Sequence, residues 1–140
     1  MVKIDNVFLI DDSEIFNFMH AKAMEKAGFA QKVRVFDNAT SALEILKQLP
    51  VSHPENFPDV IFLDISMPEM DGWEFLDSIV DLSTTVLTNC RIYILTSSID
   101  ENDVAHSKQY DMVSDFISKP LTPERLQAIS VEPHSTSKRN

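Results

Sequence analysis

The chain has 140 residues, of which 44% are hydrophobic, a size and composition that predict one folded domain with a real core. Its formal net charge of −10 argues against a nucleic-acid-binding protein, because that function needs a basic face. The single cysteine excludes an internal disulfide, no apolar run approaches the ~20 residues of a membrane helix, and the N-terminal residues lack a signal-peptide pattern, so we expect a cytoplasmic protein with no membrane partner.

Short apolar runs alternate with stretches of helical period, which predicts an α/β fold with helices on both faces of a parallel sheet. We expect strands at residues 6–10, 32–36, 59–63, 91–95 and 115–118. We expect five helices, which begin near residues 13, 38, 72, 100 and 122. The last has a clear start, with Thr122 as its cap and Pro123 as its first residue. Loops are expected at residues 51–58 and 83–89, and a flexible tail at residues 131–140 follows one domain at residues 1–130.

The first helix is expected to run from Ser13 to Gly28, because glycine commonly ends helices. Helical spacing predicts that its apolar face consists of Phe16, Met19, Ala23 and Ala27. The histidines show no metal-ligand spacing, so we expect all four at the surface: His20, His53, His106 and His134.

Residues suited to metal or phosphate chemistry directly follow four of the expected strands. Asp11 and Asp12 follow the first strand, and Asp64 follows the third. Thr96 follows the fourth strand, and Lys119 follows the fifth. Since the C-terminal ends of parallel strands lie side by side, at the edge where open α/β sheets bind ligands, we expect one acidic, cation-dependent site there.

Three carboxylates brought together either take up protons or hold a cation. A hard divalent ion such as Mg²⁺ is the expected partner, with water and phosphate oxygens completing its coordination. Together with the charge of Lys119 and the hydroxyl of Thr96, such a site can bind a phosphoryl group in transfer. The adjacent Asp11 and Asp12 favour metal binding. Asp64 stands alone and is therefore the better candidate for a nucleophile that forms an aspartyl phosphate.

Four segments in combination resemble the receiver domain of two-component response regulators: V-F-L-I-D-D, V-I-F-L-D-I-S-M-P-E-M-D-G, I-L-T-S-S and F-I-S-K-P. The resemblance covers about residues 5–130 and is to single-domain regulators of the chemotaxis type. It implies a doubly wound, flavodoxin-like fold with the strand order 2-1-3-4-5. It also implies a signalling switch rather than an enzyme, one that catalyses its own phosphorylation and dephosphorylation.

The resemblance implies which residues receive the phosphoryl group and hold the ion. Asp64 matches the phosphoacceptor. Mg²⁺, or Mn²⁺ in its place, would be held by Asp11, Asp12, Asp64 and the backbone carbonyl of Ser66. Ser66 and Ser98 occupy the positions that tune the rate of dephosphorylation in the family.

The resemblance also implies which residues sense the phosphoryl group. Lys119 matches the lysine that pairs with the phosphate, Thr96 matches the switch hydroxyl and Phe116 matches the switch aromatic residue. The Lys119–Pro120 peptide bond matches one that is cis in the family.

The partners implied by the resemblance are a sensor histidine kinase, or a small acyl phosphate in vitro, and an unknown downstream protein. The switched surface is expected to comprise the fourth helix, the fifth strand and the fifth helix, with Gln109, Tyr110 and Ser114 as candidate contacts. Trp73 is expected to be partly exposed beside the site, so that its emission reports ligand binding. We expect a monomer or a weak dimer that binds no nucleic acid.

Other functions are compatible with parts of the pattern. A metal-dependent phosphatase or phosphotransferase with an aspartyl nucleophile has its acids spaced as D-x-D after the first strand, whereas Asp11 and Asp12 are adjacent. A receiver-like interaction module that never carries phosphate predicts the loss of a key residue, and all five are present. A phosphate shuttle or sink in a phosphorelay stays open beside the output role. We therefore expect a stand-alone receiver that is phosphorylated on Asp64.

Overall fold

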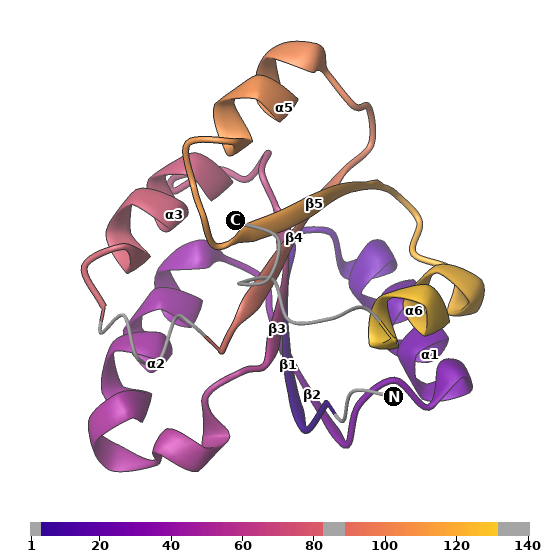
Figure 1. The fold of residues 1–140 in the computed structure, drawn as a ribbon, viewed down its shortest axis with the longest axis horizontal. Helices are drawn as coiled ribbons and strands as arrows, with labels where there is room; N and C mark the ends of the chain where they lie inside the picture. Colours follow the sequence, from indigo (N-terminus) through magenta and orange to yellow (C-terminus); the bar gives the residue numbers. More distant parts are fainter. Residues whose placement is uncertain (1–3, 83–88, 132–140) are drawn as a thin grey trace.

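The computed structural model describes residues 4–82 and 89–131. Five strands form one parallel sheet in the order β2-β1-β3-β4-β5, which confirms the predicted fold class and strand order (Figure 1). The strands are β1 (Asn6–Ile10), β2 (Lys32–Phe36), β3 (Val60–Asp64), β4 (Arg91–Thr96) and β5 (Val113–Ser118).

Helices cover both faces of this sheet (Figure 1). On one face lie α1 (Glu14–Ala27) and α6 (Pro123–Ser130). On the other lie α2 (Ala39–Ser52) and α3 (Gly72–Ile79), with α5 (Glu101–Ser107) beyond them at the β5 end of the sheet. Each helix begins after a residue whose side chain accepts a hydrogen bond from a backbone N–H of the first turn: Ser13, Asn38, Asp71, Asp100 and Thr122.

The core forms two layers because successive side chains of a strand point to opposite faces. In β1, Phe8 and Ile10 pack on the side of α2 and α3, whereas Val7 and Leu9 pack on the side of α1 and α6. The central strand β3 is buried along its whole length. Burial on both faces explains why the sequence of these strands is almost continuously apolar.

One sequence prediction about the loops needs adjustment, and two others lie almost wholly outside the described residues. The second helix continues to Ser52, so the expected loop loses its first two residues, and residues 54–56 form a short 3-10 helix, η1 (Pro54–Asn56). Of the other predicted loop and of the tail, only Asn89 and Val131 lie within the described residues. No helix in the described part of the chain is long and apolar enough to cross a bilayer.

The buried face of α1 overlaps only in part with the predicted one, because Ala23 and Ala27 pack against the core as predicted but do not form its centre. Asn17, His20 and Met24 are its buried residues, whereas Met19 is 42% exposed. His20 is fully buried, so its predicted surface position is wrong. The helical period is the one expected, but the centre of the buried face is shifted, and from this face the buried Asn17 amide donates a hydrogen bond to the Asp11 carbonyl (2.7 Å).

Candidate phosphoryl-transfer site

The register of the sheet brings the residues that follow the strands together at one edge. Ile10 lies opposite Leu63, so Asp11 and Asp64, the next residue in each strand direction, are neighbours. Thr96 lies opposite Ser118, and the Lys119 N–H donates to the Thr96 carbonyl at 2.8 Å. The structure therefore assembles the five strand-end residues that the sequence singled out.

Asp11, Asp12 and Asp64 form a compact acidic cluster, in which each offers one carboxylate oxygen within 4.8 Å of the others. Asp11 and Asp64 are buried and Asp12 is exposed, so the cluster opens to solvent on one side. Carboxylate oxygens at this spacing, with an open side for water and phosphate, suit a hard divalent cation such as Mg²⁺.

Backbone N–H groups orient the two buried carboxylates. Asp11 Oδ1 accepts a hydrogen bond from Ser13 N at 2.9 Å, and Asp64 Oδ1 accepts one from Ser66 N at 3.1 Å. Each carboxylate thereby presents its other oxygen toward Lys119.

Lys119 lies between these two oxygens. Its Nζ is 2.7 Å from Asp11 Oδ2 and 3.6 Å from Asp64 Oδ2, and its side chain is only 5% exposed. The Lys119–Pro120 peptide bond that leads away from the strand is cis. A buried ammonium that is shared by two carboxylates is positioned to pair with an oxygen of a group attached to either of them.

The burial of these charges perturbs the acid that the sequence singled out as the nucleophile. Desolvation by burial is the main cause that raises the pKa of Asp64 to about 6, and the charge of Asp11 acts in the same direction. The Ser66 N–H and Lys119 oppose this shift. The charged form of Asp64 is therefore costly in the protein alone, and a bound cation would relieve that cost.

Thr96 ends β4 with its side chain engaged in the loop toward α5. Its hydroxyl donates to the Ser98 carbonyl at 2.9 Å and accepts from Ser98 N at 3.2 Å. These two hydrogen bonds hold the start of the loop in a tight turn. The Thr96 hydroxyl can give up Ser98 and bond to another partner.

Gly72 keeps the loop after Asp64 close to the strand end. A Cβ at this position would lie 2.7 Å from the Ile65 Cα, so only glycine fits. Gly72 N donates to the Ile65 carbonyl at 3.2 Å, and Asp71 and Glu74 form a capping box around the start of α3. The loop that carries Ser66 is therefore anchored at both ends.

The acidic cluster lines a cavity of about 470 Å³. Six of its lining residues were not among the site residues predicted from the sequence: Ser13, Phe16, Ile65, Ser97, Asp100 and Asp103. Phe16 had been assigned to the core face of the first helix. Asp100 is the cap of α5, and its carboxylate accepts from Asn102 N at 2.7 Å. The sequence placed Asp100 near the start of the fourth expected helix, which indicated a helix start rather than a site.

Four side chains from α3, α5, the turn after α5 and β5 form an aromatic cluster on the neighbouring surface: Trp73, His106, Tyr110 and Phe116. Trp73 stacks on His106 at 4.1 Å between ring centroids and lies 6.4 Å from Phe116. Tyr110 donates to Asp77 Oδ1 at 2.6 Å, and burial together with this contact raises the pKa of Tyr110 to about 12. Trp73 is partly exposed, as predicted.

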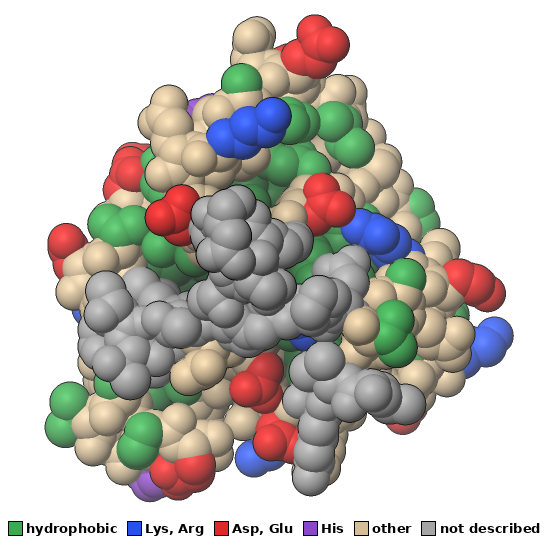
Figure 2. All heavy atoms as spheres, in the orientation of Figure 1, with side chains coloured by type: hydrophobic (Ala, Val, Ile, Leu, Met, Phe, Trp, Pro, Cys, Tyr) green, Lys and Arg blue, Asp and Glu red, His purple; other side chains and the backbone are tan. Residues whose placement is uncertain are grey.

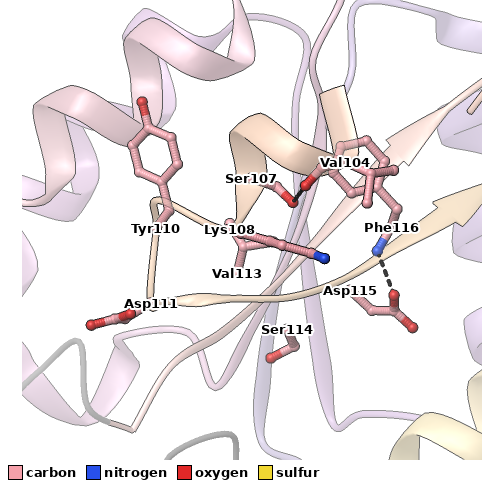
Figure 3. A pocket seen from close by; sticks show the side chains of 9 residues that line it. All are labelled: Val104, Ser107, Lys108, Tyr110, Asp111, Val113, Ser114, Asp115 and Phe116. Atoms are coloured by element: carbon pink, nitrogen blue, oxygen red, sulfur yellow. Dashed lines mark hydrogen bonds between the residues drawn. The ribbon is translucent and has the colours of Figure 1, made fainter. Parts of the chain in front are cut away.

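A second cavity, of about 280 Å³, lies between α5 and β5 on this surface (Figure 3). Phe116 and Val104 lie at one end of it, and Tyr110 and Asp111 lie at the other (Figure 3). Figure 2 shows hydrophobic side chains gathered over the same part of the molecule, with charged side chains around them. Phe116, which the family resemblance implies to be the switch aromatic residue, thus lines a surface cavity.

Comparison with known proteins identifies the family. The model of the response regulator receiver domain matches residues 7–130, and the chain belongs to this family. A two-component response regulator from Cytophaga hutchinsonii has a solved structure with a TM-score of 0.82 and 30% identity, over 91% of this chain and 94% of that one. The chemotaxis protein CheY of Bacillus subtilis is 30% identical over 89% of this chain and 93% of its own length.

A relative with an enzymatic name matches over only part of its length. Protein-glutamate methylesterase/protein-glutamine glutaminase 3 of Burkholderia thailandensis is 34% identical over 90% of this chain, but the match covers 32% of that larger protein. The segment of this chain that matches is its receiver domain, a signalling switch, so the enzymatic name of that larger protein does not extend to this chain.

Proposed function

We propose that this protein is a stand-alone receiver that accepts a phosphoryl group on Asp64 from a sensor histidine kinase and then changes its surface for a protein partner. The observation that carries this proposal is the buried Asp11–Lys119–Asp64 arrangement, with Lys119 Nζ at 2.7 and 3.6 Å from the two carboxylates. A structural ion pair would need only one carboxylate, whereas here a second one, Asp64, is buried beside the same lysine. Burial, with the charge of Asp11 acting in the same direction, raises the pKa of Asp64 to about 6.

In the proposed reaction, an Asp64 carboxylate oxygen attacks the phosphorus of the donor. The bond from phosphorus to the donor's histidine nitrogen, or to the carboxylate oxygen of an acyl phosphate, breaks and its electron pair stays with that leaving atom. Hydrolysis later returns Asp64 to its free form, and the exposed Ser66 and Ser98 beside the acceptor would tune the rate of that step.

Asp11, Asp12, Asp64 and the Ser66 backbone carbonyl would hold Mg²⁺, or Mn²⁺ in its place. The ion, when bound, neutralises charge on the oxygens of the phosphoryl group. The raised pKa of Asp64 supports this assignment, because burial and the charge of Asp11 disfavour its charged form and a bound cation would offset both.

Lys119 and Thr96 would register the new charge. The Lys119 ammonium already lies 3.6 Å from Asp64 Oδ2 and would pair with a phosphoryl oxygen there. The Thr96 hydroxyl would leave Ser98 for the phosphoryl group, which releases the loop toward α5. Phe116, on the strand that directly precedes Lys119, would then repack within the surface formed by α5, β5 and α6. Gln109, Tyr110 and Ser114 are candidate contacts on that surface. A biased two-state surface of this kind is how covalent charges act as switches.

The kinase would approach along α1, because the donor phosphate has to enter the cavity beside this helix. Two of its hydrophobic side chains, Ile15 and Met19, are 73% and 42% exposed on either side of the cavity-lining Phe16. We further propose that residues 1–130 are the functional domain, that it works in the cytoplasm as a monomer or weak dimer, and that it binds no nucleic acid.

The test is the intact mass of the protein after incubation with acetyl phosphate and Mg²⁺, beside Asp64→Asn and beside a sample with chelator. We expect one added phosphoryl group in the wild-type protein and none in either control. In parallel, Trp73 emission should respond to beryllofluoride, which mimics the aspartyl phosphate. If no adduct forms and the emission does not change, the proposal is contradicted. That result would indicate an interaction module that works without phosphate.

A further inference from the structure

Phe16 contacts the site lysine through the face of its ring. Lys119 Nζ lies 4.6 Å from the centroid of the Phe16 ring, on the ammonium that the two carboxylates share. An ammonium over an aromatic face is attracted by the negative charge density of the ring, and the attraction grows when water is excluded. The Lys119 side chain is only 5% exposed, so water is largely excluded from this contact.

Two features hold the Phe16 ring in this position. Its backbone N–H donates to the Ser13 hydroxyl at 3.2 Å, which ties the first turn of α1 to the loop that carries Asp11. On the next turn of α1, the fully buried His20 stacks on it with 5.5 Å between ring centroids. Burial lowers the pKa of His20 to about 4, so the imidazole behind Phe16 is neutral and does not compete with the ammonium.

We propose that Phe16 is a positioning residue for the phosphoryl group: its ring face holds the Lys119 ammonium against the carboxylates and so sets how tightly a phosphoryl group on Asp64 is bound. This inference rests on the function proposed above and deepens it. Phe16 also lines the cavity, so its ring excludes water from the same side of the ammonium. A flexible lysine that is restrained before the reaction loses less conformational freedom when the phosphoryl group arrives.

The chain supplies a matched control in Phe18. It lies on the same helix, is 65% exposed and has its own lysine, with Lys22 Nζ 5.7 Å from its ring, but it does not line the acidic cavity. Loss of the Phe18 ring should therefore leave the site unchanged.

The test titrates beryllofluoride with Mg²⁺ against Trp73 emission in Phe16→Leu, Phe16→Tyr and Phe18→Leu. We expect Phe16→Leu to bind roughly five-fold more weakly, Phe16→Tyr to retain wild-type affinity, and Phe18→Leu to match the wild type. Replacing Phe16 by phenylalanines with one, two and three ring fluorines keeps its shape but withdraws electron density from the face. Affinity should then fall stepwise with fluorination, which a merely steric wall would not produce.

Unchanged affinity across the fluorinated series, or in Phe16→Leu, would overturn the inference while leaving the phosphorylation of Asp64 intact. A readout without any phosphoryl group separates the two proposals. The ε-methylene protons of Lys119, assigned with Lys119→Arg, should be shifted upfield by the ring in the wild type and not in Phe16→Leu. If that shift is present but no acetyl phosphate adduct forms, the proposed function fails and the contact with Lys119 stands. If the shift is absent, the contact itself is refuted.

Discussion

The acidic site and the aromatic cluster hold their side chains in different ways. In the acidic site, Asp11, Asp64 and Lys119 are buried at strand ends and are held by backbone N–H groups and by ion pairs of 2.7 and 3.6 Å. In the aromatic cluster, half-buried rings from separate segments meet at centroid distances of 4.1 to 6.4 Å, with one hydrogen bond at the edge.

The two regions differ in their buried charge: the acidic site has more buried negative than positive charge, whereas the aromatic cluster is held by contacts between rings. The acidic site has two buried carboxylates beside one buried ammonium, so its free energy changes when a cation, a proton or a phosphoryl group is added. The aromatic cluster consists of dispersion and stacking contacts that respond little to charge. We expect ligands and pH to act on the first region and packing changes to act on the second.

The largest effect is expected from Lys119→Met, which leaves two buried carboxylates without their counter-ion. In the absence of Mg²⁺ at pH 7.5, the free energy of unfolding should fall by about 3 kcal/mol. Added Mg²⁺ should recover most of that loss, since it replaces the missing positive charge. Urea unfolding with chelator and with Mg²⁺ measures both. Lys108→Met, at the exposed lysine that follows α5, is the control. An equal loss there would show that the loss in Lys119→Met does not come from unpaired buried carboxylates.

Asp64 and His20 should make opposite contributions to the pH dependence of stability. Asp64 has a folded pKa of about 6 against an ordinary value of 3.8, so its contribution is present below pH 3.8 and is lost as the pH rises through 6. His20 has a folded pKa of about 4 against an ordinary 6.5, so its contribution is present above pH 6.5 and is lost as the pH falls through 4. Each change amounts to at most about 3 kcal/mol.

Between pH 4 and 6 these two slopes nearly cancel in the wild-type protein without Mg²⁺. Asp64→Asn should expose the histidine slope, so that its stability rises with pH. His20→Phe should expose the aspartate slope, so that its stability falls as the pH rises. Urea unfolding at half-unit steps of pH with chelator present measures the three curves. Parallel curves would show that the two groups do not titrate as their burial predicts.

His106→Ala tests the aromatic cluster, because it removes the ring that stacks on Trp73 at 4.1 Å. We expect a loss of about 1 kcal/mol in the free energy of unfolding and a shift of Trp73 emission, with no change in Mg²⁺ affinity. His53→Ala, on an exposed histidine, is the control. A change in Mg²⁺ affinity in His106→Ala would break the distinction between the two regions.

The smallest effect is expected from the hydrogen bond between Tyr110 and Asp77 at the edge of the cluster. Tyr110→Phe should cost about 0.5–1 kcal/mol, because the bond is exposed to water. A double-mutant cycle with Asp77→Asn should give a coupling of the same size. A coupling near zero would leave ring stacking alone as the force that joins α3 to Tyr110.

The acidic site could be located from the sequence because its residues directly follow strands. The apolar run that precedes Asp64 identifies a buried strand, and the C-terminal ends of parallel strands share one edge, so Asp11, Asp64 and Lys119 had to meet. The cap at Thr122 was equally visible, since a cap depends on the residues of one turn.

The shifted buried face of α1 and the aromatic cluster could not be found in the same way. Helical spacing alone allowed the face of Phe16 and Met19 as the buried one, and only contacts with the sheet show that the face of His20 is buried and that Phe16 faces Lys119. Trp73 and His106 are 33 positions apart and belong to no common motif, so nothing in the chain indicates that their rings stack.

The sequence by itself determined the succession of strands and helices along the chain, the helix starts and the strand-end residues of the acidic site. Periodicity, capping and strand ends are properties of neighbouring residues, so the sequence shows them directly. The tertiary structure alone decided which helix faces are buried, which ring lies over Lys119 and which aromatic side chains meet beside Phe116. Those choices depend on how separate elements pack, and packing is settled by the shape and desolvation of side chains that are distant in the chain.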